Sequence, residues 1–363
     1  MSPRSTRHVV LVTYGEPPTP SFVDQLTYSW RILLGLTRKI DAIPRPLLPL
    51  IALARARGRR SLWRRHRYGS PLEAITERQA RGLSEVLSTA EPGANWRMHV
   101  AYEYRDPLLA DLVRSLPEDE PVWVVPLYAA ESAFTHALSR EAVAGRRGPL
   151  FVLGALSPQL LGQAAAAHVL ALTNLEREWR GPNVALVLAA HGTVLDPPKP
   201  LHTGRESTEA VCAAIASRLS GTFGMIVNGW LNHTRGGRWT EPPIDQALEQ
   251  VKAAGYSRVV YYPYGFLADN AESELEGRLF LKSAGVEAKH LPCLNESPVL
   301  LELLARQLQQ CVASCVPGGD GSDVSPSGCA RMCQPSAAVR GSCDICAVPT
   351  TRDSAREPLV LAR

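Results

Sequence analysis

The chain has 363 residues, of which 45% are hydrophobic and 20% charged, and a net charge of +4, which is typical of a soluble globular protein of about two domains. Residues 1–7 are polar and basic, so we expect no signal peptide. The one long uncharged run, 148–175, is broken by Pro158 and contains Gln159, Gln163 and His168, which favours a buried strand and helix over a membrane span. We therefore expect a cytoplasmic protein that is at most peripheral to the inner membrane.

Short apolar runs alternate with longer helical patterns along the chain, as in parallel α/β proteins. The predicted strands are residues 8–13, 97–102, 121–127, 150–154, 184–190, 224–228, 258–263 and 286–291. The predicted helices are residues 71–87, 106–116, 158–179, 206–219, 242–254, 269–284 and 298–312. Because four strands fall on each side of residue 182, we predict an α/β fold of two similar Rossmann-like domains. Each would be a four-stranded parallel sheet flanked by helices, with a cleft between the domains.

The domain boundaries follow from this alternation and from changes in composition. We predict an N-terminal α/β domain over 7–182, a C-terminal α/β domain over 183–296 and a helix over 297–313 that packs back on the body. Residues 314–363 are rich in Gly, Ser, Pro and Cys and read as a flexible tail.

Residues 38–67 contain ten Lys or Arg residues and a single acid, Asp41, interleaved with Leu and Trp. Such a run is often only a solvated face, but it also attracts an anionic partner. Its amphipathic character favours a flat, carboxylated ligand or a lipid surface. Nothing in the chain resembles a nucleic-acid-binding module, so we expect no nucleic-acid partner.

Polar residues that could react follow the ends of three predicted strands, where open α/β sheets bind ligands. His191 follows one strand, and Tyr14 lies in a Gly- and Pro-flanked turn after another. Asp269, Glu272 and Glu276 follow a third, and their spacing of three and four predicts that they share one face of a helix. Clustered carboxylates beside an imidazole favour proton transfer or the handling of a divalent metal, although Asp269 would also serve as an N-cap.

These motifs together resemble the ferrochelatase family over about residues 8–312. The resemblance is carried by TYGEP at 13–17, YGSPLEAIT at 68–76, PLY at 126–128, AHG at 190–192, GFLADNAE at 265–272 and PCLN at 292–295. It implies an enzyme of haem biosynthesis that inserts Fe²⁺ as a substrate into coproporphyrin III or protoporphyrin IX, releases two protons and needs no nucleotide. Asn270 stands where the family often has His.

The resemblance also implies roles for individual residues. His191 matches the His that accepts protons and handles the metal, and Glu272 matches the Glu that faces it across the porphyrin. Asp269 and Glu276 match an acidic relay, and Tyr14 matches a metal- and porphyrin-contacting Tyr of the bacterial forms that use coproporphyrin III. Residues 30–67, the lip segment, correspond to a mobile lip over the porphyrin. Two basic residues in the lip segment are candidate contacts for porphyrin carboxylates: Arg31 and Arg45.

Six of the eight cysteines lie between 311 and 346. Cys329, Cys333, Cys343 and Cys346 could hold a [2Fe–2S] cluster, which some ferrochelatases carry near the C-terminus, or a zinc ion. Reduced thiols in a flexible tail are the third interpretation. Two other functions stay open: a cobalt chelatase acting on a sirohydrochlorin-type ring, and a non-catalytic haem or metal carrier. The sequence does not indicate an oligomeric state.

Overall fold

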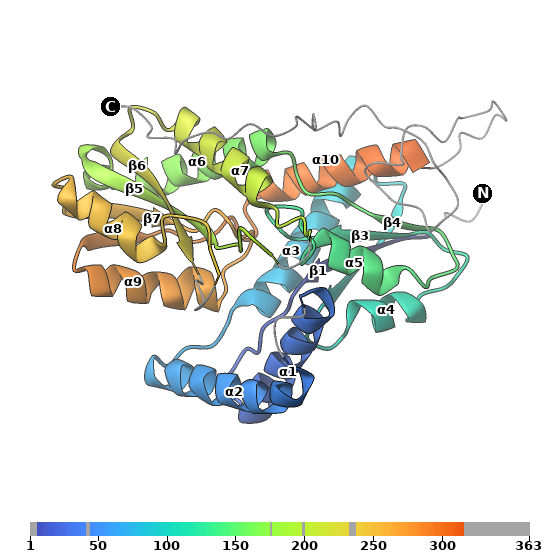
Figure 1. Ribbon diagram of the computed structural model, residues 1–363. Coiled ribbons are helices and arrows are strands. Elements are labelled where there is room, and N and C mark those ends of the chain that lie inside the picture. The colour runs from blue at the N-terminus through green and yellow to red at the C-terminus, as the bar shows by residue number, and fades with distance from the viewer. Residues whose placement is uncertain (1–5, 41–43, 175, 198–199, 232–236, 316–363) are drawn as a thin grey trace.

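The computed structural model describes residues 6–40, 44–174, 176–197, 200–231 and 237–315 (Figure 1). Two four-stranded sheets, both entirely parallel, form the body of the protein. The first has the order β2-β1-β3-β4 and the second the order β6-β5-β7-β8. Their strands are β1 Thr6–Thr13, β2 Asn95–Tyr102, β3 Val122–Pro126, β4 Leu150–Val152, β5 Gly181–His191, β6 Phe223–Leu231, β7 Arg258–Tyr262 and β8 Glu287–His290. The predicted fold class is confirmed, because each half has the same strand order.

Helices cover both faces of each sheet (Figure 1). They are α1 Phe22–Lys39, α2 Leu48–Arg65, α3 Leu72–Ala90, α4 Leu109–Ser115, α5 His136–Val143, α6 Pro158–Asn174, α7 Arg205–Arg218, α8 Ile244–Ala253, α9 Gly277–Ala284 and α10 Pro298–Cys315. Short 3₁₀ turns occur at η1 Arg45–Leu47 and η2 Arg177–Trp179, and a π-helical turn, η3, spans Ala271–Glu276. Our element predictions omitted α1, α2 and α5.

Alternating side chains of the central strands enter different cores, as expected for extended backbone. Val9 and Leu11 of β1 lie in the same buried cluster as Leu186 and Leu188 of β5, together with residues of α3, α6 and α10. The intervening residues of β1 pack instead toward α4 and α5, and those of β5 toward α8 and α9. The two sheets are thus joined through one shared core that includes α10, and the exact domain boundaries stay a prediction.

Helices α1 and α2 pack side by side at the bottom of Figure 1 and contain most of the lip segment. Their contact is made by Leu33, Leu48 and Ala52. The far end of α2 reaches the C-terminal half, where Trp63 packs on Ala271 and Leu275 of η3. The helical pair therefore belongs to the first half in sequence but contacts both. Within the described residues, no helix combines the length and the apolar character needed to cross a bilayer.

Candidate active site

His191 is the last residue of β5, and the turn after β7 lies directly against this strand end. The amide of Gly265 donates a hydrogen bond to the carbonyl of Ala189 over 3.2 Å. A Cβ atom at position 265 would lie 2.7 Å from the Cα of Ala190, closer than real Cβ contacts allow. A glycine is therefore needed to bring the chain that follows β7 next to the imidazole.

Glu272, in the first turn of η3, pairs with His191. The Nδ1 atom of His191 lies 2.7 Å from Oε1 and 2.9 Å from Oε2 of Glu272. The Glu272 side chain is 16% exposed, and the His191 side chain is 48% exposed. Burial lowers the pKa of His191, but the charge and hydrogen bond of Glu272, with the charge of Glu276, outweigh this effect and raise the pKa above its usual value. The pair stabilises an imidazolium and leaves Nε2 available to a ligand.

Asn270 fixes the start of η3. Its side-chain oxygen accepts hydrogen bonds from the amides of Glu272 and Ser273, and its own amide donates to Oγ of Ser273 over 2.9 Å. This reciprocal capping box satisfies amides that would otherwise lack partners at the helix start. The suggested N-cap role of Asp269 is therefore wrong, because the cap is Asn270.

Asp269 also lies outside the helix and not on its acidic face. Its Oδ1 accepts from the amide of Cys293 over 2.8 Å, and its Oδ2 accepts from Nδ2 of Asn295 over 2.7 Å. The prediction of three carboxylates on one helical face is wrong for this residue, because the helix begins at Ala271. Asp269 is 7% exposed and binds the loop after β8 to the start of η3.

Glu276 and Glu16 complete the acidic cluster beside the His191–Glu272 pair. Burial and the negative charge of Glu272, opposed by Arg59, raise the pKa of Glu276 to about 7. Glu16, 4% exposed, accepts a hydrogen bond from the amide of Ala271 over 2.9 Å. Burial raises the pKa of Glu16 as well, and Arg59 again opposes the increase. Glu16 belongs to the TYGEP motif, and no role was predicted for it from the sequence, although an acid near Tyr14 at a strand end is a signal for one.

Tyr14 lies on the N-terminal side of this cluster. It packs with Leu72, Ile75 and Ala268. Burial, followed by the charges of Glu16 and other neighbours including Glu272, raises the pKa of its hydroxyl well above the usual value. The residue therefore holds its proton through the neutral range.

A cavity of about 30 Å³ lies between the two halves of the molecule, at the carboxyl ends of β1, β3 and β7. Tyr14, Leu72 and Tyr128 line it from the N-terminal half, and Phe266 and Asn270 from the C-terminal half. Tyr128, like Glu16, is a residue of the site for which no role was predicted from the sequence. The space is that of about one water molecule.

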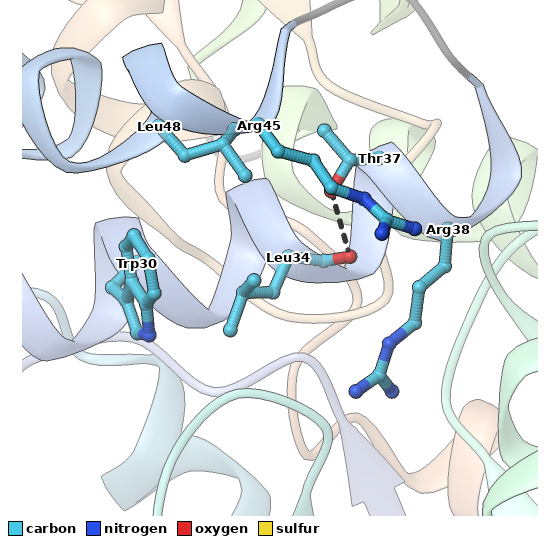
Figure 2. Close-up of a pocket in the computed structure, with 6 residues that line it drawn as sticks. All are labelled: Trp30, Leu34, Thr37, Arg38, Arg45 and Leu48. Atoms are coloured by element: carbon cyan, nitrogen blue, oxygen red, sulfur yellow. Dashed lines mark hydrogen bonds between the residues drawn. The ribbon is translucent and has the colours of Figure 1, made fainter.

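The two basic candidates of the lip segment lie in different surroundings. Arg31 pairs with Asp106, with Nη2–Oδ distances of 3.1 and 3.2 Å, and donates to the carbonyl of Tyr104 over 3.4 Å. Arg45 lines a cavity of about 360 Å³ between α1 and α2. Figure 2 shows the side chains of Arg38 and Arg45 at the end of the cavity away from Trp30, with their guanidinium groups separated. The other lining residues are Leu34, Thr37 and Leu48.

The predicted tail ligands, Cys329, Cys333, Cys343 and Cys346, lie outside the described residues. Within the part of the chain that the structure describes, no three His, Cys, Asp or Glu side chains converge closely enough to hold a metal ion. Cys212 and Cys293 are free thiols in the body, and burial raises the pKa of both.

Two linked parallel sheets with a His–Glu pair and further carboxylates at one strand edge define an α/β enzyme equipped for proton and metal chemistry. The family model of ferrochelatase matches residues 6–311, and this chain belongs to the ferrochelatase family of metal chelatases. It is thus an enzyme of haem biosynthesis that inserts Fe²⁺ into a porphyrin.

Curated relatives agree with the family assignment. The ferrochelatase of Xylella fastidiosa (strain M12) is 25% identical over 334 residues, which cover 85% of this chain and 99% of that protein. The ferrochelatase of Acidobacterium capsulatum is 27% identical over 277 residues, which cover 68% of this chain and 82% of that protein.

Among solved structures, SirB from Bacillus subtilis with Fe³⁺ matches with 8% identity and a TM-score of 0.46, covering 84% of this chain and 95% of that chain. CbiX, the terminal enzyme for biosynthesis of siroheme in denitrifying bacteria, matches with 14% identity and a TM-score of 0.45, covering 84% and 98%.

Proposed function

We propose that His191 and Glu272 carry out the exchange in which one Fe²⁺ enters the porphyrin and two pyrrole protons leave. The observation that supports this proposal best is the 2.7 Å contact between Nδ1 of His191 and a carboxylate oxygen of Glu272. In the neutral tautomer, Nδ1–H donates to Glu272, so the lone pair of Nε2 accepts a pyrrole proton. Glu272 then stabilises the imidazolium, as the raised pKa of His191 indicates.

The abstracted protons leave through the acidic cluster. Glu276 lies close enough to Glu272 and His191 for their charges to shift its pKa, which is about 7, so it both takes up and releases protons near neutral pH. Neutral imidazole and carboxylate oxygen are also suitable first ligands for Fe²⁺ on its way to the ring nitrogens. This role for Glu276 keeps half of the relay proposed from sequence. We assign Asp269 to support of the site, because its carboxylate is engaged by Cys293 and Asn295.

Anaerobic insertion of Fe²⁺ and Co²⁺ into coproporphyrin III, protoporphyrin IX and sirohydrochlorin tests the proposal. We expect iron insertion into a porphyrin, and His191→Ala should lower kcat by about 10²- to 10⁴-fold, the usual contribution of a general base. Cobalt insertion into sirohydrochlorin alone would favour the alternative chelatase. If His191→Ala inserts iron as fast as the wild type, the assignment of the base is wrong.

We propose coproporphyrin III as the physiological substrate. Tyr14, the residue that resembles the coproporphyrin-using forms, lines the cavity between the two halves. Coproporphyrin also carries more propionates than protoporphyrin, and Arg38 and Arg45 line the cavity of about 360 Å³ in the lip segment. The cavity of about 30 Å³ at the strand ends is far smaller than a tetrapyrrole, so the residues that line it must move apart to admit the ring. A kcat/KM ratio that favours protoporphyrin would overturn this choice.

The lip segment also supports peripheral contact with a membrane. Leu47 and Leu50 are 48% and 66% exposed, and they lie beside the exposed basic residues of α2. Exposed Leu side chains on a basic helix favour an anionic lipid surface. Sedimentation with vesicles that contain phosphatidylserine should carry the protein down, and Leu47→Ser/Leu50→Ser should reduce this binding. Equal recovery of wild type and variant with the vesicles would contradict the contact.

The tail carries a separate proposal, a [2Fe–2S] cluster or a zinc ion held by Cys329, Cys333, Cys343 and Cys346. Protein that is red-brown before any porphyrin is added supports the cluster, and a colourless protein with bound zinc supports the alternative. Colourless, metal-free protein purified without oxygen contradicts both.

A further inference from the structure

Arg59 lies on a face of α2 whose other residues are buried and uncharged. Ala52, Ala56 and Trp63 are at most 1% exposed and lie three or four residues from one another or from Arg59, so all four share one face of the helix. Arg57, two residues away, is exposed on another face. A cation on the buried face of a helix requires partners, because desolvating a charge is costly.

The partners of Arg59 are the acidic cluster and an aromatic ring. Its guanidinium carbon lies 4.8 Å from the centroid of the Tyr28 ring, the geometry of a cation–π contact. The charges of Glu16 and Glu276 both act on it, and it opposes the increase in the pKa of both carboxyl groups. Its Nη1 atom is buried and makes no hydrogen bond within the described residues. Within the described part of the chain, the guanidinium thus acts on both carboxylates through its charge without forming an ion pair with either.

The packing of α2 keeps this cation at the site. Trp63, one turn beyond Arg59 on the same face, is buried against Ala271 and Leu275 of η3, the turn that carries Glu272 and Glu276. Tyr68, just after α2, packs edge-on to Trp63 with a centroid distance of 5.0 Å and donates to Glu274 over 3.3 Å. The position of the Arg59 face of α2 relative to η3 is therefore set by an apolar contact between the two halves.

We propose that Arg59 is a positioning residue that supplies a positive charge to the site carboxylates while no metal is bound, and that it thereby weakens and tunes the affinity of the site for Fe²⁺. A divalent cation approaching Glu272 and Glu276 meets the positive charge that already acts on Glu276, and like charges repel. Weak, adjustable binding suits a site that must pass its metal on to a porphyrin. This inference rests on the proposed function, because it takes the His191–Glu272 pair as the place where metal arrives.

Binding of Mn²⁺ to the full chain, followed by the electron paramagnetic resonance of the free ion, tests the inference. Mn²⁺ is suitable because it prefers carboxylate over thiolate ligands and so avoids the cysteine-rich tail. Titrations at about pH 8 keep most of the carboxylates ionised. Arg59→Met removes the charge and keeps an apolar stem, Arg59→Lys keeps the charge, and Arg57→Met is the matched control on the exposed face.

We expect Arg59→Met to bind Mn²⁺ about tenfold more tightly than the wild type, since one nearby unit charge is removed at intermediate dielectric. Arg59→Lys and Arg57→Met should stay within about twofold of the wild type, because neither removes charge from the cluster. A merely structural role for Arg59 predicts the opposite result, a weaker site in Arg59→Met, and that outcome overturns the proposal, as does unchanged affinity.

Glu272→Gln separates this inference from the function on which it rests. Loss of Mn²⁺ binding in Glu272→Gln with no gain in Arg59→Met rejects the role of Arg59 and keeps the metal site. Unchanged Mn²⁺ binding in Glu272→Gln rejects the metal site itself and the inference with it. If Arg59→Met does not fold, Arg59→Gln provides the same charge removal with a polar side chain.

Discussion

The two halves of the molecule place different chemistry at equivalent points. β1 and β5 hold the same position in sheets of the same order, and a Gly follows the cleft residue of each: Tyr14 before Gly15, and His191 before Gly192. Tyr14 is packed against apolar side chains and keeps its proton, whereas His191 is 48% open and its pKa is raised toward the charged form. The same strand topology thus places an uncharged residue, Tyr14, at the cleft in one half and a proton acceptor, His191, in the other.

The difference begins with residue type, because a phenol has an ordinary pKa of about 10 and an imidazole one of about 6.5. The turn beside each strand end then sets the surroundings of each residue. Next to β5, Gly265 and the cap of Asn270 bring Glu272 within hydrogen-bonding distance of the imidazole. Next to β1, the acid nearest to Tyr14 in sequence is Glu16, and that carboxylate is engaged by the amide of Ala271. Residue type therefore decides which strand end titrates near neutral pH, and the neighbouring turn provides the His with its carboxylate partner.

Removing the partner of His191 should have the largest effect. Glu272→Gln keeps the shape of the side chain but removes its charge, so iron insertion should fall by about 10²-fold or more. The charge of Glu272 raises the pKa of His191, so in the variant this pKa falls. Insertion requires the neutral imidazole and rises with pH through that pKa; the rising limb of the pH profile should therefore move to lower pH.

Glu274→Gln is the control on the same turn, since Glu274 pairs with Arg278 and not with His191. It should stay within about threefold of wild-type activity, as expected for a partly exposed ion pair. A pH profile of Glu272→Gln with its limb unmoved would show that His191 is not the titrating base.

The close contact between Gly265 and Ala190 predicts the next largest effect. Gly265→Ala places a methyl group 2.7 Å from the backbone Cα of Ala190, so the turn or the strand end must shift. We expect a loss of about 1–3 kcal/mol in the free energy of unfolding, measured by urea denaturation, together with reduced activity.

Gly58→Ala on α2 is the control, because a Cβ there meets nothing within 4 Å. It should leave activity unchanged and raise the free energy of unfolding by up to about 1 kcal/mol through helix propensity. Equal stabilities for the two variants would mean that the approach at Gly265 does not constrain the site.

The cap of η3 should matter less. Asn270→Ala leaves the amides of Glu272 and Ser273 without their acceptor and should lower the free energy of unfolding by about 0.5–2 kcal/mol. Asn270→Ser restores a capping oxygen and should recover most of that loss. If Asn270→Ala is as stable as the wild type but inactive, position 270 has a direct chemical role, as the family's common His there suggests.

The sequence was sufficient for the sheets because the central strands β1, β3, β5 and β7 are short, largely buried apolar runs. It was insufficient for α2, in which an apolar face of Leu48, Ala52, Ala56 and Trp63 is hidden among six of the arginines in the basic run. An Arg-rich helix reads as a solvated surface unless its buried face is traced residue by residue.

The candidate site shows the same division between local and long-range information. Motif resemblance implied that Glu272 faces His191 across the porphyrin, whereas in the structure the two side chains are in direct contact over 2.7 Å. The position of Asp269 could not be inferred, because its partners, Cys293 and Asn295, are 24 and 26 residues further along the chain. Spacing predicts which residues share a helix face only when the helix begins where the pattern begins.

Tyr14→Phe should have the smallest effect on activity, and it tests directly whether Tyr14 acts only as an uncharged residue. The sequence offered two roles for Tyr14, a metal contact and a porphyrin contact, and its raised pKa disfavours a phenolate that binds metal near neutral pH. Removing the hydroxyl should therefore leave kcat for Fe²⁺ insertion unchanged, and the rising limb of the pH profile should stay at the same pH. It should raise KM for coproporphyrin III by about tenfold at most, the value of one neutral hydrogen bond. A larger loss of kcat, or a shift of the pH limb, would place Tyr14 among the reacting groups and remove the contrast between the two strand ends.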